Sequence, residues 1–266
     1  MNRLNENIYS EHMIKEDIMN EHMKRIKFVE VDSEFLKEEI YKLRYDVYVS
    51  EFGFEKKEDH PLGLEKDIYD PYSVELAAIE QIDENTQKVI GTIRLILHSE
   101  NGFPIENVAP TDFKGEKPPI EKIAEISRLT INKDYRRRQG DGLFGVESYL
   151  KASEGGTLPN KGRTRKKIIR IQPFLILGLF KELYHVSKKL GITHWYMITE
   201  KKLWYALKRF NLIFRQIGEP VYYHGLRIPY LGVIDEIEQD LMNKHMNFYQ
   251  DFLVGLDKQY WPAELR

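Results

Sequence analysis

The chain of 266 residues contains no cysteine, which excludes disulfide bonds, thiolate-held metal ions and a cysteine nucleophile. Long hydrophobic runs are also missing, because the longest candidate, Phe174–Phe180, is far shorter than the ~20 apolar residues of a membrane-spanning helix. The polar residues 1–25 have no apolar core of signal-peptide length. We therefore expect a cytoplasmic enzyme or binding protein.

Motifs for metals, nucleotides and nucleic acids are missing as well. The eight histidines are scattered, and neither H-x-x-x-H nor H-E-x-x-H occurs. A phosphate loop of the type G-x-x-x-x-G-K-[ST] is not present. Most aromatic residues fall in predicted core stripes, and the basic residues gather in one loop rather than along a groove. We predict no metal, no bound cofactor and no nucleic-acid partner.

Charge is unevenly distributed along the chain. The total is −2, yet residues 133–170 hold eleven basic and four acidic residues, a local charge of +7. A segment of this charge on an otherwise acidic chain favours an acidic partner, and a solvated surface loop is the alternative.

Hydrophobic periodicity predicts alternating strands and helices. A helix follows an N-cap at Asp32 or Ser33, and it places Tyr41, Arg44 and Tyr48 on a stripe beside its core face. Residues 50–73 have no clear period but carry several large apolar side chains, which favours an ordered functional loop. The pattern predicts strands at 26–31, 74–81, 88–97, 123–131, 192–199, 212–218 and 220–234, and helices at 174–191, 200–211 and from 234 onward.

Three short strings carry the most chemical information: "EKDIYD" (Glu65–Asp70), "GTIRL" (Gly91–Leu95) and "AEISRL" (Ala124–Leu129). They are preceded by "LRYDVYVSEFGFE" (Leu43–Glu55). Together they place arginines, acidic groups and aromatics on elements expected to form one cleft. Their order resembles the acyl-homoserine-lactone synthases and the N-acyl amino acid synthases, both of the GNAT acyltransferase superfamily.

The resemblance is specific to particular positions. Tyr48 and Phe54 depart from it, since the family usually carries phenylalanine and tryptophan there. The matching positions are Arg44, Tyr48, Phe54, Asp67, Asp70, Arg94, Glu125 and Arg128.

The resemblance implies a GNAT-like α/β (α+β) fold with a mixed, mostly antiparallel sheet of about seven strands and helices on both faces. The expected organisation is an N-terminal extension (1–25), the acyltransferase domain (26–233) with a flexible insertion (141–161), and a C-terminal helix (234–266) packed on the domain.

The C-terminal string "YYHGLRIP" (Tyr222–Pro229) looks closest to the acyltransferases associated with PEP-CTERM/exosortase systems. Within it, His224 and Arg227 are candidates for binding an acceptor carboxylate, because arginine suits carboxylate geometry. A turn histidine and a surface arginine are the alternative reading.

The basic segment opens with "RRRQGDG" (Arg136–Gly142), which partly matches the loop where GNAT enzymes meet the phosphates of their thioester carrier. The resemblance therefore implies that Arg136, Arg137 and Arg138 bind acyl-carrier protein or its phosphopantetheine. About 30 residues separate this string from the helix near Pro173, where the free N–H groups of the helix terminus favour anions.

Arg94 and Arg128 lie on apolar strands, so they need carboxylate partners if they are buried. Asp67, Asp70 and Glu125 are the expected partners. Glu125 and Arg128 are three residues apart, and a regular strand would send them to opposite faces. A β-bulge near Ile126–Arg128 would bring both to one side, as the central strand of the superfamily does.

The predicted function is transfer of a fatty acyl group from acyl-carrier protein, or acyl-CoA, to the amine of an amino acid or related small molecule. Glu125 is the expected base, Arg94 and Arg128 orient it or bind the acceptor, and Asp67 and Asp70 hold the acceptor amine. The loop wall over the site is expected from Arg44, Tyr48 and Phe54. The alternatives are an acyl-homoserine-lactone synthase that uses S-adenosylmethionine, and a non-catalytic acyl-carrier-binding protein.

Overall fold

The computed structural model describes residues 23–113, 117–136 and 171–266. The predicted N-terminal extension lies mostly outside these residues, and the insertion at 141–161 lies wholly outside them, as do Arg137 and Arg138. No helix in the described part of the chain has the length and apolarity required to cross a membrane.

The elements alternate as the periodicity predicts. In chain order the strands are β1 (Ile26–Glu30), β2 (Ser73–Gln81), β3 (Gln87–Leu97), β4 (Ile123–Ile131), β5 (His194–Thr199), β6 (Arg215–Gln216), β7 (Val221–Tyr222) and β8 (Leu226–Val233). The α-helices are α2 (Glu34–Tyr45), α3 (Pro104–Val108), α5 (Ile171–Leu190), α6 (Lys201–Arg209), α7 (Ile234–Lys244) and α8 (Met246–Leu253).

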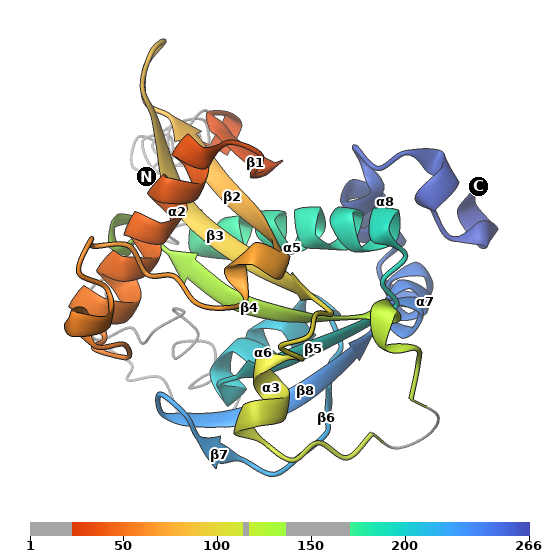
Figure 1. Ribbon diagram of the computed structural model, residues 1–266. Coiled ribbons are helices and arrows are strands. Elements are labelled where there is room, and N and C mark those ends of the chain that lie inside the picture. Colours follow the sequence, from red (N-terminus) through yellow and green to blue (C-terminus); the bar gives the residue numbers. More distant parts are fainter. Residues whose placement is uncertain (1–22, 114–116, 137–170) are drawn as a thin grey trace, which may run out of the picture.

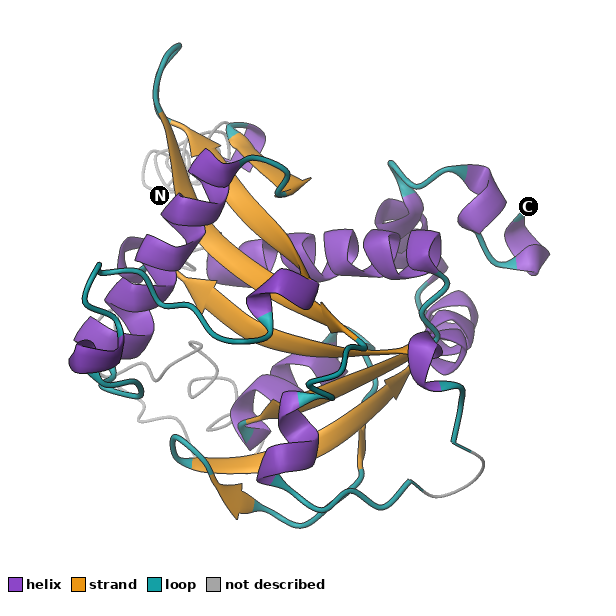
Figure 2. Cartoon of the chain, viewed as in Figure 1, coloured by secondary structure: helices purple, strands orange, loops and turns teal. Residues whose placement is uncertain are grey.

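One eight-stranded sheet in the order β1-β2-β3-β4-β5-β8-β6, with β7 on β8, organises the molecule (Figure 2). Among the strand pairs of the described residues, only β4–β5 is parallel. This confirms the predicted mixed, mostly antiparallel sheet. The strand predicted at 220–234 is a hairpin instead, because His224 and Gly225 adopt φ values of +50° and +100° that turn the chain.

Helix α2 covers one face of the sheet. Its N-cap is Ser33, whose hydroxyl accepts a hydrogen bond from the Leu36 N–H at 3.3 Å. The buried side chains of Ile40, Leu43 and Val47 follow at helical spacing. They pack against small and branched residues of β2 and β3. The helix then continues into a π-helical turn before the loop that leads to the site.

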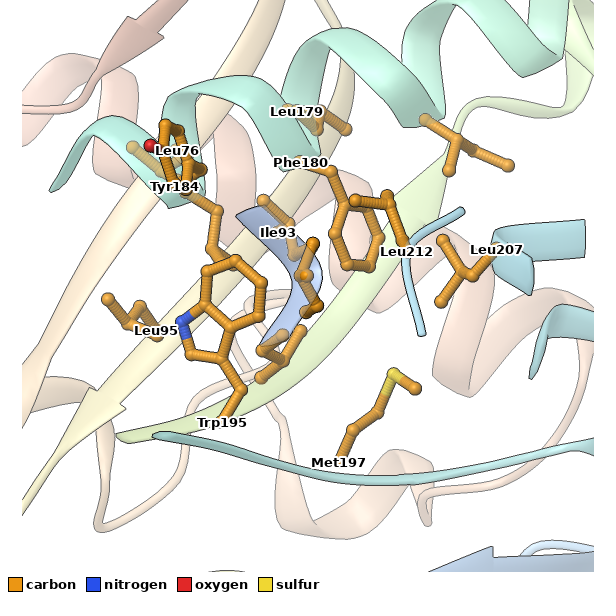
Figure 3. Packing of buried hydrophobic residues seen from close by; sticks show 14 of the residues in the cluster. Leu76, Ile93, Leu95, Leu179, Phe180, Tyr184, Trp195, Met197, Leu207 and Leu212 are labelled. Atoms are coloured by element: carbon orange, nitrogen blue, oxygen red, sulfur yellow. The ribbon is translucent and has the colours of Figure 1, made fainter. Parts of the chain in front are cut away.

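Helix α5 covers the opposite face (Figure 1). Figure 3 shows Leu179 and Phe180 of this helix among Leu76, Ile93 and Trp195 of the strands, within the main apolar core. A leucine-rich stripe against branched strand residues removes a large apolar area from water, at about 25 cal/mol per Å². This core fixes the sheet on which the site is built.

The ring of Phe28 on β1 packs closely against α5 at Gly178. A Cβ atom added there would lie 2.1 Å from the ring of Phe28 on β1. Only glycine therefore allows the edge strand to seat its aromatic ring on the helix.

Strands β4 and β5 separate halfway along β4. They pair only at Ile123–Ile126 with His194–Met197, and from there on β4 pairs with β3 alone (Figure 1). In the second half of β4 the register with β3 slips, because Thr92 pairs with Thr130 while Arg94 pairs with Ser127. Strand β4 thus carries one extra residue at the point where it leaves β5.

The C-terminal region differs from the single helix predicted from residue 234. Two helices, α7 and α8, meet at His245, whose backbone is not helical (φ −146°, ψ 47°). They are held to α5 by the hydroxyl of Tyr184, which donates to Glu238 at 2.5 Å and lies 2.9 Å from the hydroxyl of Tyr249. Lys188 adds an ion pair to Glu238 at 2.8 Å.

Candidate active site

A buried cluster of arginines and carboxylates lies between α2 and the sheet. We call it the arginine–carboxylate network. Its members are Arg44, Arg94, Arg128, Glu65, Asp67, Asp70 and Glu75.

Arg44 reaches into this network from α2 and is fully buried. Its Nε donates to Glu65 at 2.5 Å, and its Nη1 donates to Asp70 at 2.7 Å and to Glu75 at 3.1 Å. A guanidinium taken out of water requires such partners on its donors. The predicted stripe beside the core face of α2 is therefore the stripe that holds the network.

Arg94 enters from β3. Its Nη1 and Nη2 donate to the two oxygens of Asp67 at 2.7 and 2.9 Å, a two-bond contact that fixes both side chains. Nη1 also donates to Asp70 at 2.5 Å, and Nε donates to the hydroxyl of Ser127 on β4 at 2.9 Å. The pairing of Arg94 with Asp67 and Asp70 is the one that the sequence predicts.

Arg128 occupies the bulge of β4, with φ +50°. Its guanidinium donates to Glu65 at 2.8 Å and to Asp67 at 3.1 Å, and it lies 5.1 Å from the ring centre of Tyr48. In a regular strand Arg128 and its neighbour Ser127 would point to opposite faces. The bulge turns Arg128 into the network, close to where the sequence predicts it.

The neighbouring arginines determine the protonation state of two carboxyl groups of the network, those of Glu65 and Asp67. Burial raises the pKa of the Glu65 carboxyl, but the charges and hydrogen bonds of Arg128 and Arg44 outweigh it and bring the pKa to about 2. For Asp67, Arg94 likewise overcomes burial and holds the pKa well below its usual range. Both carboxylates are therefore ionised at neutral pH.

Glu125 is buried on the same sheet face, but it does not join the network. Its Oε2 accepts a hydrogen bond from the Ile105 N–H in the first turn of α3 at 2.9 Å. The arginines of the network donate to its own carboxylates instead, so Arg94 and Arg128 do not orient Glu125 directly, and their other expected role, binding of the acceptor, stays a prediction. Burial raises the pKa of Glu125 to about 8, because that single amide and the more distant arginines do not compensate for lost hydration.

Glu65 and Glu75 are the members that the sequence reasoning missed. Glu65 is the first residue of the "EKDIYD" string and lies two residues before Asp67, so the string itself could have identified it as a site residue. Glu75 lies on β2 directly opposite Arg94 in the strand register. Both positions require knowledge of how the loop and the hairpin are aligned.

Aromatic side chains from the two halves of the chain meet beside the network. The Phe54 ring lies 5.2 Å from Phe52, 6.0 Å from Tyr48 and 5.3 Å from His224, centre to centre. The Arg227 guanidinium lies 5.9 Å from the same ring. The tip of the β7–β8 hairpin therefore packs on the loop that follows α2, and together they form a wall that contains Tyr48 and Phe54 as predicted. Arg44, predicted in the same wall, is not part of it, because its guanidinium is fully buried in the network.

The charged groups of that hairpin already have protein partners. Arg227 forms an ion pair with Glu200 at 3.1 Å, and the His224 ring lies 3.6 Å from Glu55. Glu55 also lies 3.6 Å from Arg128, so it connects the hairpin to the network. Burial lowers the pKa of His224 despite the charge of Glu55.

Arg136 also contacts this loop. It pairs with Glu51 and lies 5.2 Å from the ring centre of Phe52. The first arginine of the basic segment thus lies next to the aromatic wall. Among the described residues, no group of three or more histidine, aspartate or glutamate side chains is arranged to hold a metal ion.

The sheet, the parting of β4 from β5 and the bulge identify the fold. Residues 43–144 match the model of a family described as "Acetyltransferase (GNAT) domain". The protein has a GNAT-type fold. The match includes all seven members of the arginine–carboxylate network.

Solved structures with a similar fold extend over most of the chain. TofI in a ternary complex with an inhibitor and MTA has a TM-score of 0.51 and 13% identity, over 79% of this chain and 91% of that one. BjaI, a CoA-dependent acyl-homoserine lactone synthase, has a TM-score of 0.49 and 18% identity, over 79% and 83%. FeeM, an N-acyl amino acid synthase from uncultured soil microbes, has 0.47 and 12%, over 81% and 94%. Curated protein sequences give no match.

Proposed function

We propose that the protein is an N-acyltransferase. It moves a fatty acyl group from acyl-carrier protein or acyl-CoA to the amine of an amino acid or related small molecule. The observation that carries this proposal is the bulge of β4, which places Arg128 in the network at the point where β4 leaves β5. Thioester and acceptor would meet there.

The chemistry requires little from the protein beyond placement and polarity. The amine nitrogen attacks the thioester carbon, a C–N bond forms, the C–S bond breaks and the thiolate leaves. Backbone N–H groups released from a ladder by a bulge are suitable donors to the oxyanion of the intermediate. An ammonium has no lone pair, so one proton must leave before attack, through a water if the base is not in contact.

The acceptor amine is assigned to Asp67. Its side chain is 23% exposed, against 6% for Asp70, 3% for Glu75 and 1% for Glu65. Since Asp67 is ionised and held by Arg94, it presents a fixed negative edge to a cation. Glu125 remains the candidate base, because a pKa near 8 suits proton transfer at neutral pH.

The experiment is a product analysis. Purified protein is incubated with a long-chain acyl-carrier protein or acyl-CoA and either the common amino acids or S-adenosylmethionine, and products are identified by mass spectrometry. We expect an N-acylated amino acid or related amide. A lactone formed from S-adenosylmethionine would favour the synthase alternative, and no acyl product from any pair would favour a carrier-binding protein.

A further inference from the structure

Glu75 is the one member of the arginine–carboxylate network with an unpartnered oxygen. It is buried on β2, and its Oε1 accepts a hydrogen bond from Arg44 at 3.1 Å. Its Oε2 is also buried and has no hydrogen-bond partner. A buried carboxyl oxygen without a hydrogen-bond partner costs considerable hydration free energy when the group is ionised. The cost is much smaller when the group is protonated.

No cationic side chain around Glu75 pairs with Glu75 alone. From α2 it faces Arg44, whose donors are shared with Glu65 and Asp70. From β3 it faces Arg94, whose guanidinium binds Asp67 and Asp70. The remaining neighbours are Asp70, which is acidic, and Tyr41, whose pKa is raised to about 12 and which is therefore neutral.

The charge balance of the whole network gives the same answer. Three guanidiniums face four carboxyl groups, so full ionisation leaves one negative charge in a buried layer. One bound proton removes that charge. Glu65 and Asp67 are poor places for it, since the arginines hold the pKa of both carboxyls low. Asp70 is a poor place as well, because Arg44, Arg94 and the Asp67 N–H already donate to its two oxygens. The unpartnered oxygen of Glu75 is the suitable place.

We infer that Glu75 is a positioning residue that holds a proton in the free protein and releases it when a cationic acceptor binds at Asp67. The step balances: Glu75–COOH becomes Glu75–COO⁻, the proton passes to solvent, and the new negative charge is matched by the ammonium. This inference rests on the proposed function, because it takes the acceptor to be an amine. It extends that function by coupling acceptor binding to pH.

The pKa of Glu75 lies where such coupling is useful. Burial raises it to about 7, against the charges of Arg44 and Arg94 and with the help of Asp70. Below that pH, acceptor binding must expel a proton that the site prefers to keep. The KM for the acceptor should then rise by about tenfold for each pH unit below the pKa.

Glu75→Gln tests the inference, because an amide keeps the acceptor oxygen for Arg44 but is neutral at every pH. Infrared difference spectra of the intact chain between about pH 5.5 and about pH 9 report protonated carboxyl groups directly. We expect a carboxylic acid band that titrates near neutrality in the unaltered protein and is missing in the Glu75→Gln variant. Glu125→Gln is the matched control, since it removes a different buried carboxyl with a raised pKa.

Kinetics with the common amino acids as acceptors and a long-chain acyl-carrier protein or acyl-CoA as donor test the coupling. We expect the Glu75→Gln variant to show an acceptor KM raised about tenfold at high pH and independent of pH, with kcat little changed. Because Glu125 gives a band of its own, the decisive comparison is made in the Glu125→Gln background, where a carboxylic acid band that persists after Glu75→Gln overturns the inference. A KM with the same pH dependence in both proteins overturns the coupling. If no acceptor is acylated, the proposed function fails, and the infrared result still decides where the proton resides.

Discussion

Arg94 and Asp67 face each other through two parallel hydrogen bonds of 2.7 and 2.9 Å, although they are 27 residues apart in the chain. This contact joins β3 to the loop before β2. Asp67 also accepts from Arg128 on β4 and from the N–H of Tyr69 within its own loop. The carboxylate that we assign to the acceptor is therefore held from three directions, and its orientation is fixed before any ligand arrives.

Replacing Arg94 with lysine should disable this site. Lysine keeps the positive charge but loses the planar fork that matches Asp67. We expect Arg94→Lys to lower kcat/KM for the acceptor at least tenfold and to reduce the free energy of unfolding by about 1–3 kcal/mol. Arg215→Lys is the control, since that pair with Glu236 is half exposed and weak. Equal effects from both variants would count against the fork.

The positive φ of Arg128 makes a second prediction about stability. Both Arg128→Ala and Arg128→Gly remove the contacts with Glu65, so both should unfold more easily. Alanine keeps the strain of a left-handed backbone and glycine relieves it, so the glycine variant should be more stable by about 1 kcal/mol in urea unfolding. At Ser127, where φ is not positive, the order should reverse. A glycine variant weaker than alanine at 128 would contradict the bulge geometry.

The sequence predicts the strands, the α2 stripe and the pairing of Arg94 with Asp67 and Asp70, because local periodicity and the need to pair buried charges determine them. It does not predict Glu75. Counting along the β2–β3 hairpin from its turn, where Ile79 pairs with Val89, would put Glu75 opposite Ile93. A register shift after Ile79 moves Arg94 into that place instead. A bulge leaves no reliable mark in a sequence, yet it decides which side chains meet.

The β7–β8 hairpin and the break between α7 and α8 also differ from the prediction because the local sequence pattern does not reveal them. The chain turns at Gly225 and stops being helical at His245, and in neither place does the hydrophobic pattern break. Only contacts distant in sequence, such as Tyr184 with Glu238 and Tyr249, determine how these segments fold back. The packing of the hairpin on the Phe54 loop is likewise invisible to a local pattern.

Glu125→Gln separates a base from a structural clamp. A general base contributes 10²-fold or more, so its loss should reduce kcat by about that factor. A side chain that only holds α3 through the Ile105 N–H should leave kcat within a few fold, since glutamine retains the accepting oxygen. Glu121→Gln, an exposed neighbour before β4, is the control. Turnover that is unchanged in the Glu125 variant would remove Glu125 from the mechanism.

The same variant has a stability signature with a defined sign. The folded-state pKa of Glu125 is about 8 against an ordinary 4.5, so between these pH values the folded state binds the extra proton. The stability of the unaltered protein should therefore fall as pH rises through this window, by an amount on the order of a few kcal/mol, and the fall should be smaller in the Glu125→Gln variant, where only Glu75, with a pKa of about 7, still contributes. Urea unfolding across the window measures the difference.

Arg136 lies where the basic segment meets the aromatic wall, and two roles are open to it. If it contributes charge to an acidic carrier protein, Arg136→Glu should raise the carrier KM and weaken its salt dependence. Lys133→Glu, an exposed change of equal charge in the same segment, should then act in the same direction. If Arg136 instead positions the loop through Glu51 and Phe52, only its own variant should have an effect, and Glu51→Gln should reproduce it at all salt concentrations. Steady-state kinetics with acyl-carrier protein at low and high salt distinguish the two, because a lost carrier contact fades with screening and a displaced wall does not.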